Sequence, residues 1–113
     1  MSEYFYPLDG RKHYKDLMEA QKDMFQAFIQ FNNEVFEKPS SLPRKVKELI
    51  AVAVAHTTQC PYCIEGHVKA AKKEGATDQE IAESIFVAAA LRAGGAFAHS
   101  TISMGVIKGT EKK

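Results

Sequence analysis

Apolar residues recur at helical spacing along most of this 113-residue chain, and this periodicity constrains the fold more than any other feature. Residues 13–37 predict one long amphipathic helix, and a second helix is expected from about Leu42. Ser41 is a plausible cap for that second helix and Pro43 suits its first turn. The apolar positions of the first segment are Tyr14, Leu17, Met18, Met24, Phe25, Phe28, Phe31, Val35 and Phe36.

Proline and glycine residues divide the second half of the chain. Pro61 suits the first position of a third helix, which is expected to run to about Glu74 and to stop at Gly75. Thr77 or Asp78 caps a fourth helix. The Gly94-Gly95 pair predicts an interruption, and a fifth helix is expected over residues 96–107.

The two ends of the chain carry no strong helical pattern. Residues 1–12 predict an irregular arm, and residues 108–113 predict a frayed tail. Together these patterns predict one all-α domain over residues 1–113, a compact arrangement of about five to six helices.

Net charge and hydropathy argue against nucleic acid and membranes as partners. The 15 basic and 14 acidic residues give a net charge of +1, which provides no basic field for nucleic acid. The longest wholly apolar runs, of which residues 49–55 are one, are far shorter than the roughly 20 residues of a membrane span. The polar, acidic start does not resemble a signal peptide. A cytoplasmic protein that binds neither membrane nor nucleic acid is expected.

The two cysteines of the chain stand in the motif Cys60-Pro61-Tyr62-Cys63, with His67 four residues later. Paired cysteines in a cytosolic protein are more often catalytic or metal-binding than structural. If a helix starts at Pro61, Cys63 lies in its first turn, where the helix dipole favours a thiolate. His67 then shares one face with Cys63. We therefore expect Cys63 to have a lower pKa than Cys60.

Glu48 on the preceding helix could orient His67, or take a proton from Cys63 directly or through water. Two other interpretations of the cluster remain open. The cysteines could be inert core residues, or Cys60, Cys63 and His67 could bind zinc with Glu48 or His56 as the fourth ligand. A closed zinc site usually takes a second ligand pair from a distant segment, and the chain has no second cysteine pair. No metal or cofactor is therefore expected.

Three further residues could belong to the wall of a pocket. Tyr62 lies between the two cysteines, and His56 ends the second predicted helix, where a role in capping that helix is favoured. His99 follows the Gly94-Gly95 pair on an alanine-rich segment, where a buried, hydrogen-bonded histidine is the default expectation.

The spacing of Glu48, Cys60, Cys63 and His67 resembles the alkylhydroperoxidase D-like core of the carboxymuconolactone decarboxylase superfamily. The resemblance covers about residues 40–105. It implies an all-helical fold, oligomers built from dimers or trimers, often hexamers, and thiol-dependent reduction of peroxides. The other family-like segments are Lys47-Glu48-Leu49-Ile50, Ala55-His56, Ala70-Ala71, Gly75-Ala76, Gly94-Gly95 and His99.

The resemblance also implies roles for individual residues. Cys63 would be the attacking thiol and Cys60 the resolving thiol, with Glu48 and His67 as proton-transfer partners. Tyr62 occupies a position where the best-known members carry a histidine of the proton relay, and a phenol is a poor base at neutral pH. The decarboxylase members lack the cysteine pair, so its presence argues against that activity.

The expected function is that of a thiol peroxidase or disulfide reductase, with a peroxide as substrate and an external dithiol or thioredoxin-like protein as reductant. One alternative is a redox- or zinc-binding regulatory module. Another is a lactone decarboxylase or hydrolase that uses His67 and Glu48 as acid and base. Because a chain of this size buries only about two-thirds of its unfolded surface alone, a homo-oligomer is expected, a trimer or a hexamer.

Overall fold

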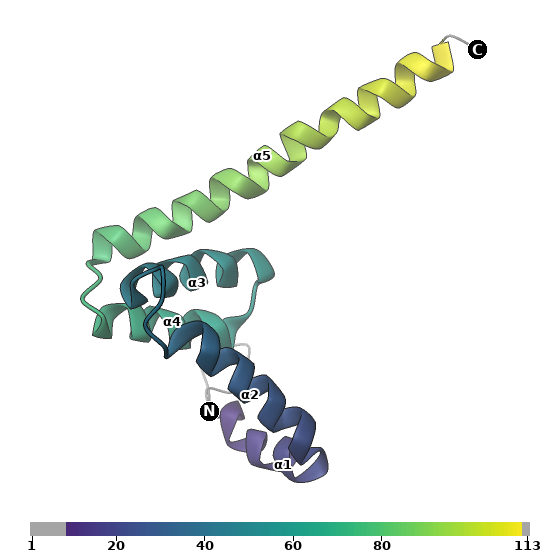
Figure 1. Ribbon diagram of the computed structural model, residues 1–113. Helices are drawn as coiled ribbons and strands as arrows, with labels where there is room; N and C mark the ends of the chain where they lie inside the picture. The colour runs from purple at the N-terminus through teal and green to yellow at the C-terminus, as the bar shows by residue number, and fades with distance from the viewer. Residues whose placement is uncertain (1–8, 112–113) are drawn as a thin grey trace.

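The computed structural model describes residues 9–111, and every regular element within that range is a helix (Figure 1). The all-α prediction is therefore confirmed. In chain order the elements are the 3₁₀ helix η1 (Gly10–His13) and the α-helices α1 (Tyr14–Ala20), α2 (Lys22–Phe36), α3 (Arg44–Thr58), α4 (Pro61–Lys73) and α5 (Asp78–Glu111).

The core of the body lies where α3 packs against α4 and against the first half of α5 (Figure 1). Small side chains fill it, so these helices approach closely. Leu49, Val68 and Ile85 pack around the buried cluster as half-buried neighbours. The cluster itself consists of Val52, Ala71, Ala76 and Ile81.

Local signals fix the junction between α4 and α5 as the sequence predicts. Gly75 takes a φ of +91°, and the amide of Ala76 donates to the carbonyl of Ala71, which closes a Schellman motif after α4. Thr77 Oγ1 accepts from the amide of Glu80 at 3.1 Å, and the Glu80 carboxylate accepts from the amide of Thr77 at 2.8 Å. This reciprocal pair is a capping box at the start of α5.

The prediction of one continuous helix over residues 13–37 is wrong. Gln21 adopts an extended conformation, with φ −148° and ψ 75°, and divides the segment into α1 and α2. The break lets α1 fold back on α2, where the rings of Tyr14 and Phe25 lie 6.2 Å apart between centroids. In one straight helix these residues would be about 16 Å apart along the axis, so tertiary contact between aromatic rings favours the break.

Helix α3 begins two residues later than the sequence predicts. Pro43 is its N-cap rather than a residue of its first turn, with an extended ψ of 151°, and Ser41 lies outside the helix. A proline disfavours helical geometry in the residue before it, which excludes Leu42 from the helix. Of the arm predicted over residues 1–12, residues 1–8 lie outside the described range, and residues 10–12 belong to η1.

The predicted interruption at Gly94-Gly95 is also wrong, because α5 continues through both glycines to Glu111. A glycine inside a helix costs only about 1 kcal/mol, so a glycine pair does not by itself end a helix. The residues predicted to fray are helical up to Glu111, while residues 112 and 113 lie outside the described range. Beyond Arg92, which donates to the carbonyl of Thr57 at 2.6 Å, α5 projects from the body (Figure 1).

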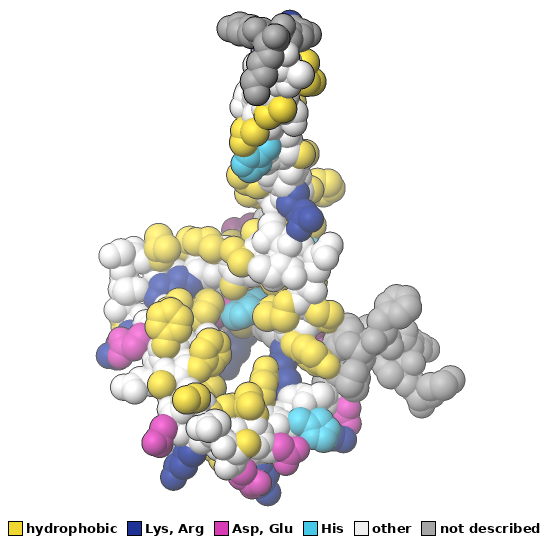
Figure 2. Space-filling model, turned by 90° about the vertical axis from the view of Figure 1, so that its right-hand side faces the viewer, with side chains coloured by type: hydrophobic (Ala, Val, Ile, Leu, Met, Phe, Trp, Pro, Cys, Tyr) yellow, Lys and Arg dark blue, Asp and Glu magenta, His cyan; other side chains and the backbone are white. Residues whose placement is uncertain are grey.

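The unbroken length of α5 bears on the expectation that the protein does not bind membranes. By length and composition alone, α5 could cross a membrane, and only 11% of its most apolar window is buried. The sequence pattern missed this property because two predicted short helices form one long helix. Figure 2 shows hydrophobic side chains along the projecting arm. The large apolar side chains of α5 that are exposed are Phe86, Val87, Leu91, Phe97, Ile102, Met104, Val106 and Ile107.

Candidate redox site

The cysteine motif lies at the N-terminus of α4, as the sequence predicts. Cys60 is the N-cap residue, with an extended backbone, and Pro61 occupies the first helical position. The sulfur of Cys60 accepts the backbone N–H of Cys63 at 3.3 Å. Both cysteines are free thiols and both are half-buried. The chain therefore folds locally so that a sulfur atom performs the capping role that serine or aspartate usually fills.

The pKa order of the two thiols is the reverse of the one predicted. Hydrogen bonds from the Cys63 side chain, and then from backbone N–H groups, hold the pKa of Cys60 below its ordinary value. Burial, followed by the neighbouring sulfur of Cys60, raises the pKa of Cys63 to about 11. The N-terminal N–H groups of α4 point at the capping residue, and this is why they stabilise a thiolate on Cys60.

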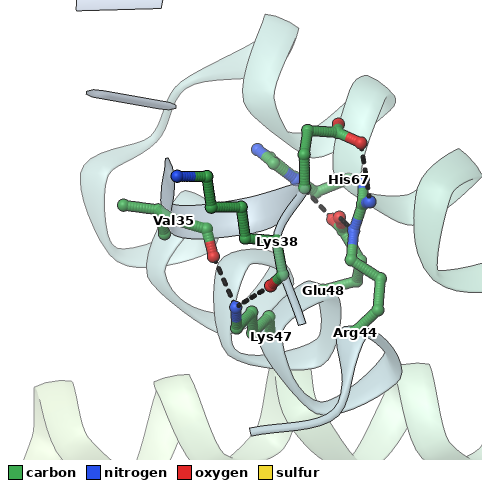
Figure 3. Close-up of polar contacts among 7 residues, drawn as sticks. Val35, Lys38, Arg44, Lys47, Glu48 and His67 are labelled. Carbon is green, nitrogen blue, oxygen red and sulfur yellow. Dashed lines mark hydrogen bonds and ion pairs between the residues drawn. The ribbon is translucent and has the colours of Figure 1, made fainter. Parts of the chain in front are cut away.

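The side chains of Glu48 on α3 and His67 on α4 point toward one another (Figure 3). The Glu48 side chain is 1% exposed, and its Oε1 lies 2.7 Å from Nδ1 of His67. Its Oε2 accepts from Nε of Arg44 at 2.8 Å. Both carboxylate oxygens are thus engaged, which is how a buried acid is tolerated. The contact expected between Glu48 and His67 is present, and it leaves Nε2 of the imidazole as the nitrogen available for proton exchange.

The end of α2 fixes the His67 ring from its other side. Phe36 stacks on the imidazole, with centroids 5.1 Å apart and planes inclined by 29°. The Arg44 guanidinium lies 6.0 Å from the centroid of the same phenyl ring. Lys47 anchors this end of α2 by donating to the carbonyls of Val35 at 2.6 Å and Lys38 at 3.4 Å (Figure 3).

Sequence reasoning missed Phe36, Arg44 and Lys47 as supports of the site. Only Arg44 carried a local signal, because it precedes Glu48 by four residues, the spacing of an ion pair on one helix face. The pairing also raises the pKa of Arg44, chiefly through the hydrogen bond to Glu48.

Two cavities open onto the site, and Cys63, His67 and Phe36 line both. The smaller, of about 510 Å³, has almost wholly apolar walls that include Leu42, Ile50, Ala51, Val54 and Ala55. The larger, of about 810 Å³, extends beneath α1 and α2 and also reaches Cys60. Figure 2 shows a hollow of this kind in the helical body, surrounded by hydrophobic side chains.

Arg11, which sequence reasoning also missed, lies at the larger cavity beside the motif. Its Nη2 donates to the carbonyl of Tyr62, and the residue lines the cavity together with Cys60 and Cys63. Its positive charge helps to lower the pKa of Cys60 and opposes part of the rise in the pKa of Cys63. No local sequence pattern marks Arg11 as part of the site, because it is 51 residues from Tyr62 and outside the segment that resembles the family.

The three residues considered for a pocket wall have different places. Tyr62 lines the larger cavity. His56 lines neither cavity, and its Nδ1 lies 2.8 Å from the carbonyl of Val52 within α3. His99 also lines neither, and it is exposed on α5 rather than buried. Within residues 9–111, no three His, Cys, Asp or Glu side chains lie close enough together to hold a metal ion.

Comparison with known proteins identifies the relatives of this chain. The model of the carboxymuconolactone decarboxylase family matches residues 22–102. "Uncharacterized protein 4 in cox locus" of Paracoccus denitrificans is 53% identical over 81 residues, which are 72% of each chain. "Uncharacterized protein YdfG" of Bacillus subtilis is 38% identical over 53 residues, 47% of this chain and 36% of that protein.

A solved structure supports the same relationship. The crystal structure of a protein from Methanobacterium thermoautotrophicum is 30% identical to this chain and superposes on it with a TM-score of 0.70. The superposition covers 76% of this chain and 96% of the other. Since the family match extends over more than half of the sequence and the fold agrees, this chain belongs to the carboxymuconolactone decarboxylase family.

Proposed function

We propose that this protein is a thiol-dependent oxidoreductase that reduces organic hydroperoxides with its Cys60–Cys63 pair. The observation that carries the proposal is the capping sulfur of Cys60, whose pKa is lowered where α4 begins. A thiolate is the reactive form of cysteine, and a second thiol three residues away can close a disulfide with it.

In the first step the thiolate of Cys60 attacks the terminal oxygen of the hydroperoxide. The O–O bond breaks, the alkoxide leaves and takes a proton to become an alcohol, and Cys60 becomes a sulfenic acid. This order assigns attack to Cys60 and resolution to Cys63, opposite to the roles implied by family resemblance. The lowered pKa of Cys60 and the raised pKa of Cys63 support the assignment.

In the second step Cys63 must lose its proton before it can attack the sulfur of Cys60. Burial is the largest cause of the raised pKa of Cys63, so this thiol needs a base to ionise at neutral pH. His67 lies one turn further along α4 and lines the same cavities, so we assign it as the base, oriented by Glu48. The Cys60 S–O bond breaks, and the departing hydroxide takes the proton to form water.

The cycle closes when an external dithiol, such as a thioredoxin-like protein, reduces the disulfide by thiol exchange. Two electrons leave the dithiol and two reduce the peroxide, so the steps balance. Tyr62 contributes to the cavity wall in this scheme, and proton transfer runs through His67 and Glu48 alone.

The test is peroxide consumption with a dithiol reductant by wild-type protein, Cys60→Ser and Cys63→Ser. We expect both variants to lose turnover with dithiol, and only Cys63→Ser to accumulate a sulfenic acid on Cys60 that a dimedone-type reagent traps. Equal turnover in all three proteins would refute the proposal. Stoichiometric zinc in protein purified without chelator would instead favour a zinc-binding regulatory module.

A second candidate function, lactone decarboxylation or hydrolysis, is favoured by one observation. His67, held by the buried Glu48, lines the smaller apolar cavity, where an acid–base pair could act without either thiol. That activity should survive in the Cys60→Ser/Cys63→Ser double variant and disappear in His67→Gln. The thiol mechanism predicts loss of activity in both.

We also propose that the protein is a cytoplasmic homo-oligomer, a trimer or hexamer, whose subunits bury the second half of α5. Phe97 is 81% exposed and Val106 is 64% exposed, which is unusual for large apolar side chains on one segment. Light scattering of detergent-free protein tests the proposal. A monomer at micromolar concentration, or recovery only in the membrane fraction, would contradict it.

A further inference from the structure

We propose that Arg11 forms an anion subsite of the redox site, so that the larger cavity takes organic hydroperoxides that carry a carboxylate. The inference rests on the proposed function, because it names the substrate class of the same site. It adds an N-terminal residue to the site that lies outside the matched family segment, residues 22–102.

The N-terminal segment is fitted closely against the first turns of α4. A Cβ atom on Gly10 would come within 2.7 Å of the Tyr62 hydroxyl oxygen, and a Cβ atom on Gly66 within 2.8 Å of Nη2 of Arg11. Both glycines thus permit the contact through which Arg11 reaches the carbonyl of Tyr62. The guanidinium therefore has a defined position beside the cysteines.

The charge of Arg11 is not neutralised by the partner it binds, since a carbonyl oxygen is uncharged and engages one of five guanidinium N–H donors. Arg44, the other arginine of the larger cavity, is committed to the carboxylates of Glu48 and Glu37. The nearby carboxylate of Glu65, whose pKa Arg11 helps to lower, is bound by Lys69 at 2.9 Å. Toward the residues that the structure describes, Arg11 thus keeps donors for a ligand.

The rest of the cavity suits an alkyl or aryl chain. Beyond Arg11 its walls come mainly from the apolar face of α1 and α2, including Leu17, Met24, Phe25, Phe28 and Ile29. A volume of about 810 Å³ lies within the range of small-molecule sites. A ligand that carries its carboxylate and hydroperoxide near one end of an apolar chain would place the carboxylate on Arg11 and the peroxide near Cys60, with the chain along α1 and α2.

The first experiment compares a long-chain carboxylic acid hydroperoxide with its methyl ester, using kcat/KM for each. We expect wild-type protein to prefer the acid by about five- to tenfold, the usual effect of a charge-assisted hydrogen bond at a partly exposed site. The ratio removes any general effect of Arg11 on thiol reactivity. Arg11→Gln should lower the ratio to about one.

Two further variants sharpen this comparison. Lys12→Gln is the matched control, because Lys12 is the adjacent cation, pairs with Asp9 at 2.9 Å and does not line the cavity. It should keep the wild-type ratio. Gly66→Ala should displace the guanidinium without changing the charge of the protein, and should lower the ratio. An unchanged ratio in Arg11→Gln would overturn the proposal.

A binding measurement separates this inference from the proposed function. Calorimetric titration with octanoate and with octanamide, neither of which is oxidising, reports on the subsite without turnover. We expect wild-type protein and Lys12→Gln to bind octanoate about five- to tenfold more tightly than octanamide. Arg11→Gln should bind the two probes with equal affinity. That result supports the subsite even if no peroxide is consumed. Equal affinities for the two probes in wild-type protein refute the subsite, even if peroxide is consumed.

Discussion

When the reduced protein is treated with a limiting amount of iodoacetamide, Cys60 should be alkylated before Cys63. Hydrogen bonds from Cys63 hold the pKa of Cys60 below its ordinary value of 9.0, while burial raises the pKa of Cys63 to about 11. The pKa values are thus at least about two pH units apart, so near neutral pH the Cys60 thiolate is at least about a hundredfold more abundant.

Nucleophilicity falls with pKa and offsets part of that advantage. A Brønsted coefficient of about 0.4–0.5 over two pH units makes each Cys60 thiolate roughly eightfold less reactive than a Cys63 thiolate. The net preference for Cys60 is therefore about tenfold. The rate should rise with pH and level off above the pKa of Cys60, which lies below 9.0.

Removing the Cys63 side chain tests the cause of the lowered pKa. The hydrogen bond from that side chain is the largest contribution to the shift, so Cys63→Ala should move the midpoint of Cys60 alkylation to higher pH. Cys63→Ser, which keeps a hydroxyl donor, should move it less. Mass spectrometry of samples quenched between pH 6 and pH 10 gives both midpoints. Alkylation of Cys63 first, or an unmoved midpoint in Cys63→Ala, would refute the reasoning.

Three further predictions concern stability and assembly. Glu48→Gln should cost about 1–3 kcal/mol in thermal or urea unfolding, because a buried ion pair is broken, whereas Glu34→Gln at an exposed pair should cost less than about 0.5 kcal/mol. Val52→Ala should cost about 2 kcal/mol because Val52 is 0% exposed, while the 51%-exposed Val54 should tolerate alanine nearly unchanged. Phe97→Asp should dissociate the oligomer in light scattering, and an unchanged mass would contradict the proposed use of α5.

The sequence predicts the site well where its signals are local. Pro61 fixes the start of α4 at the motif, and Gly75 and Thr77 fix the junction with α5, because each acts on its own backbone or the next turn. The contact between Glu48 and His67 follows from two helical faces that meet in the core. These features depend on the spacing of residues along the chain, which can be read from a single sequence.

The supports that the sequence does not predict are long-range. Arg11 reaches the site from η1, 51 residues before Tyr62 in the sequence, and Phe36 stacks on His67 where α2 is anchored against α3. The predicted order of the two cysteine pKa values is wrong for a local reason. The capping residue and the first turn are three residues apart, and the orientation of one sulfur toward the helix end decides which thiol is stabilised.

The second half of α5 poses a different question, namely what stabilises it. Beyond Arg92 the helix leaves the body, and residues 96–110 are exposed. An isolated helix of about 15 residues is marginal in water even when alanine-rich, and each glycine costs it about 1 kcal/mol more. This segment contains Gly105 and Gly109 and follows Gly94-Gly95. A helix with that composition gains its stability by burying an apolar face. The exposed apolar face of α5 is therefore the strongest physical argument for the proposed contact with other subunits.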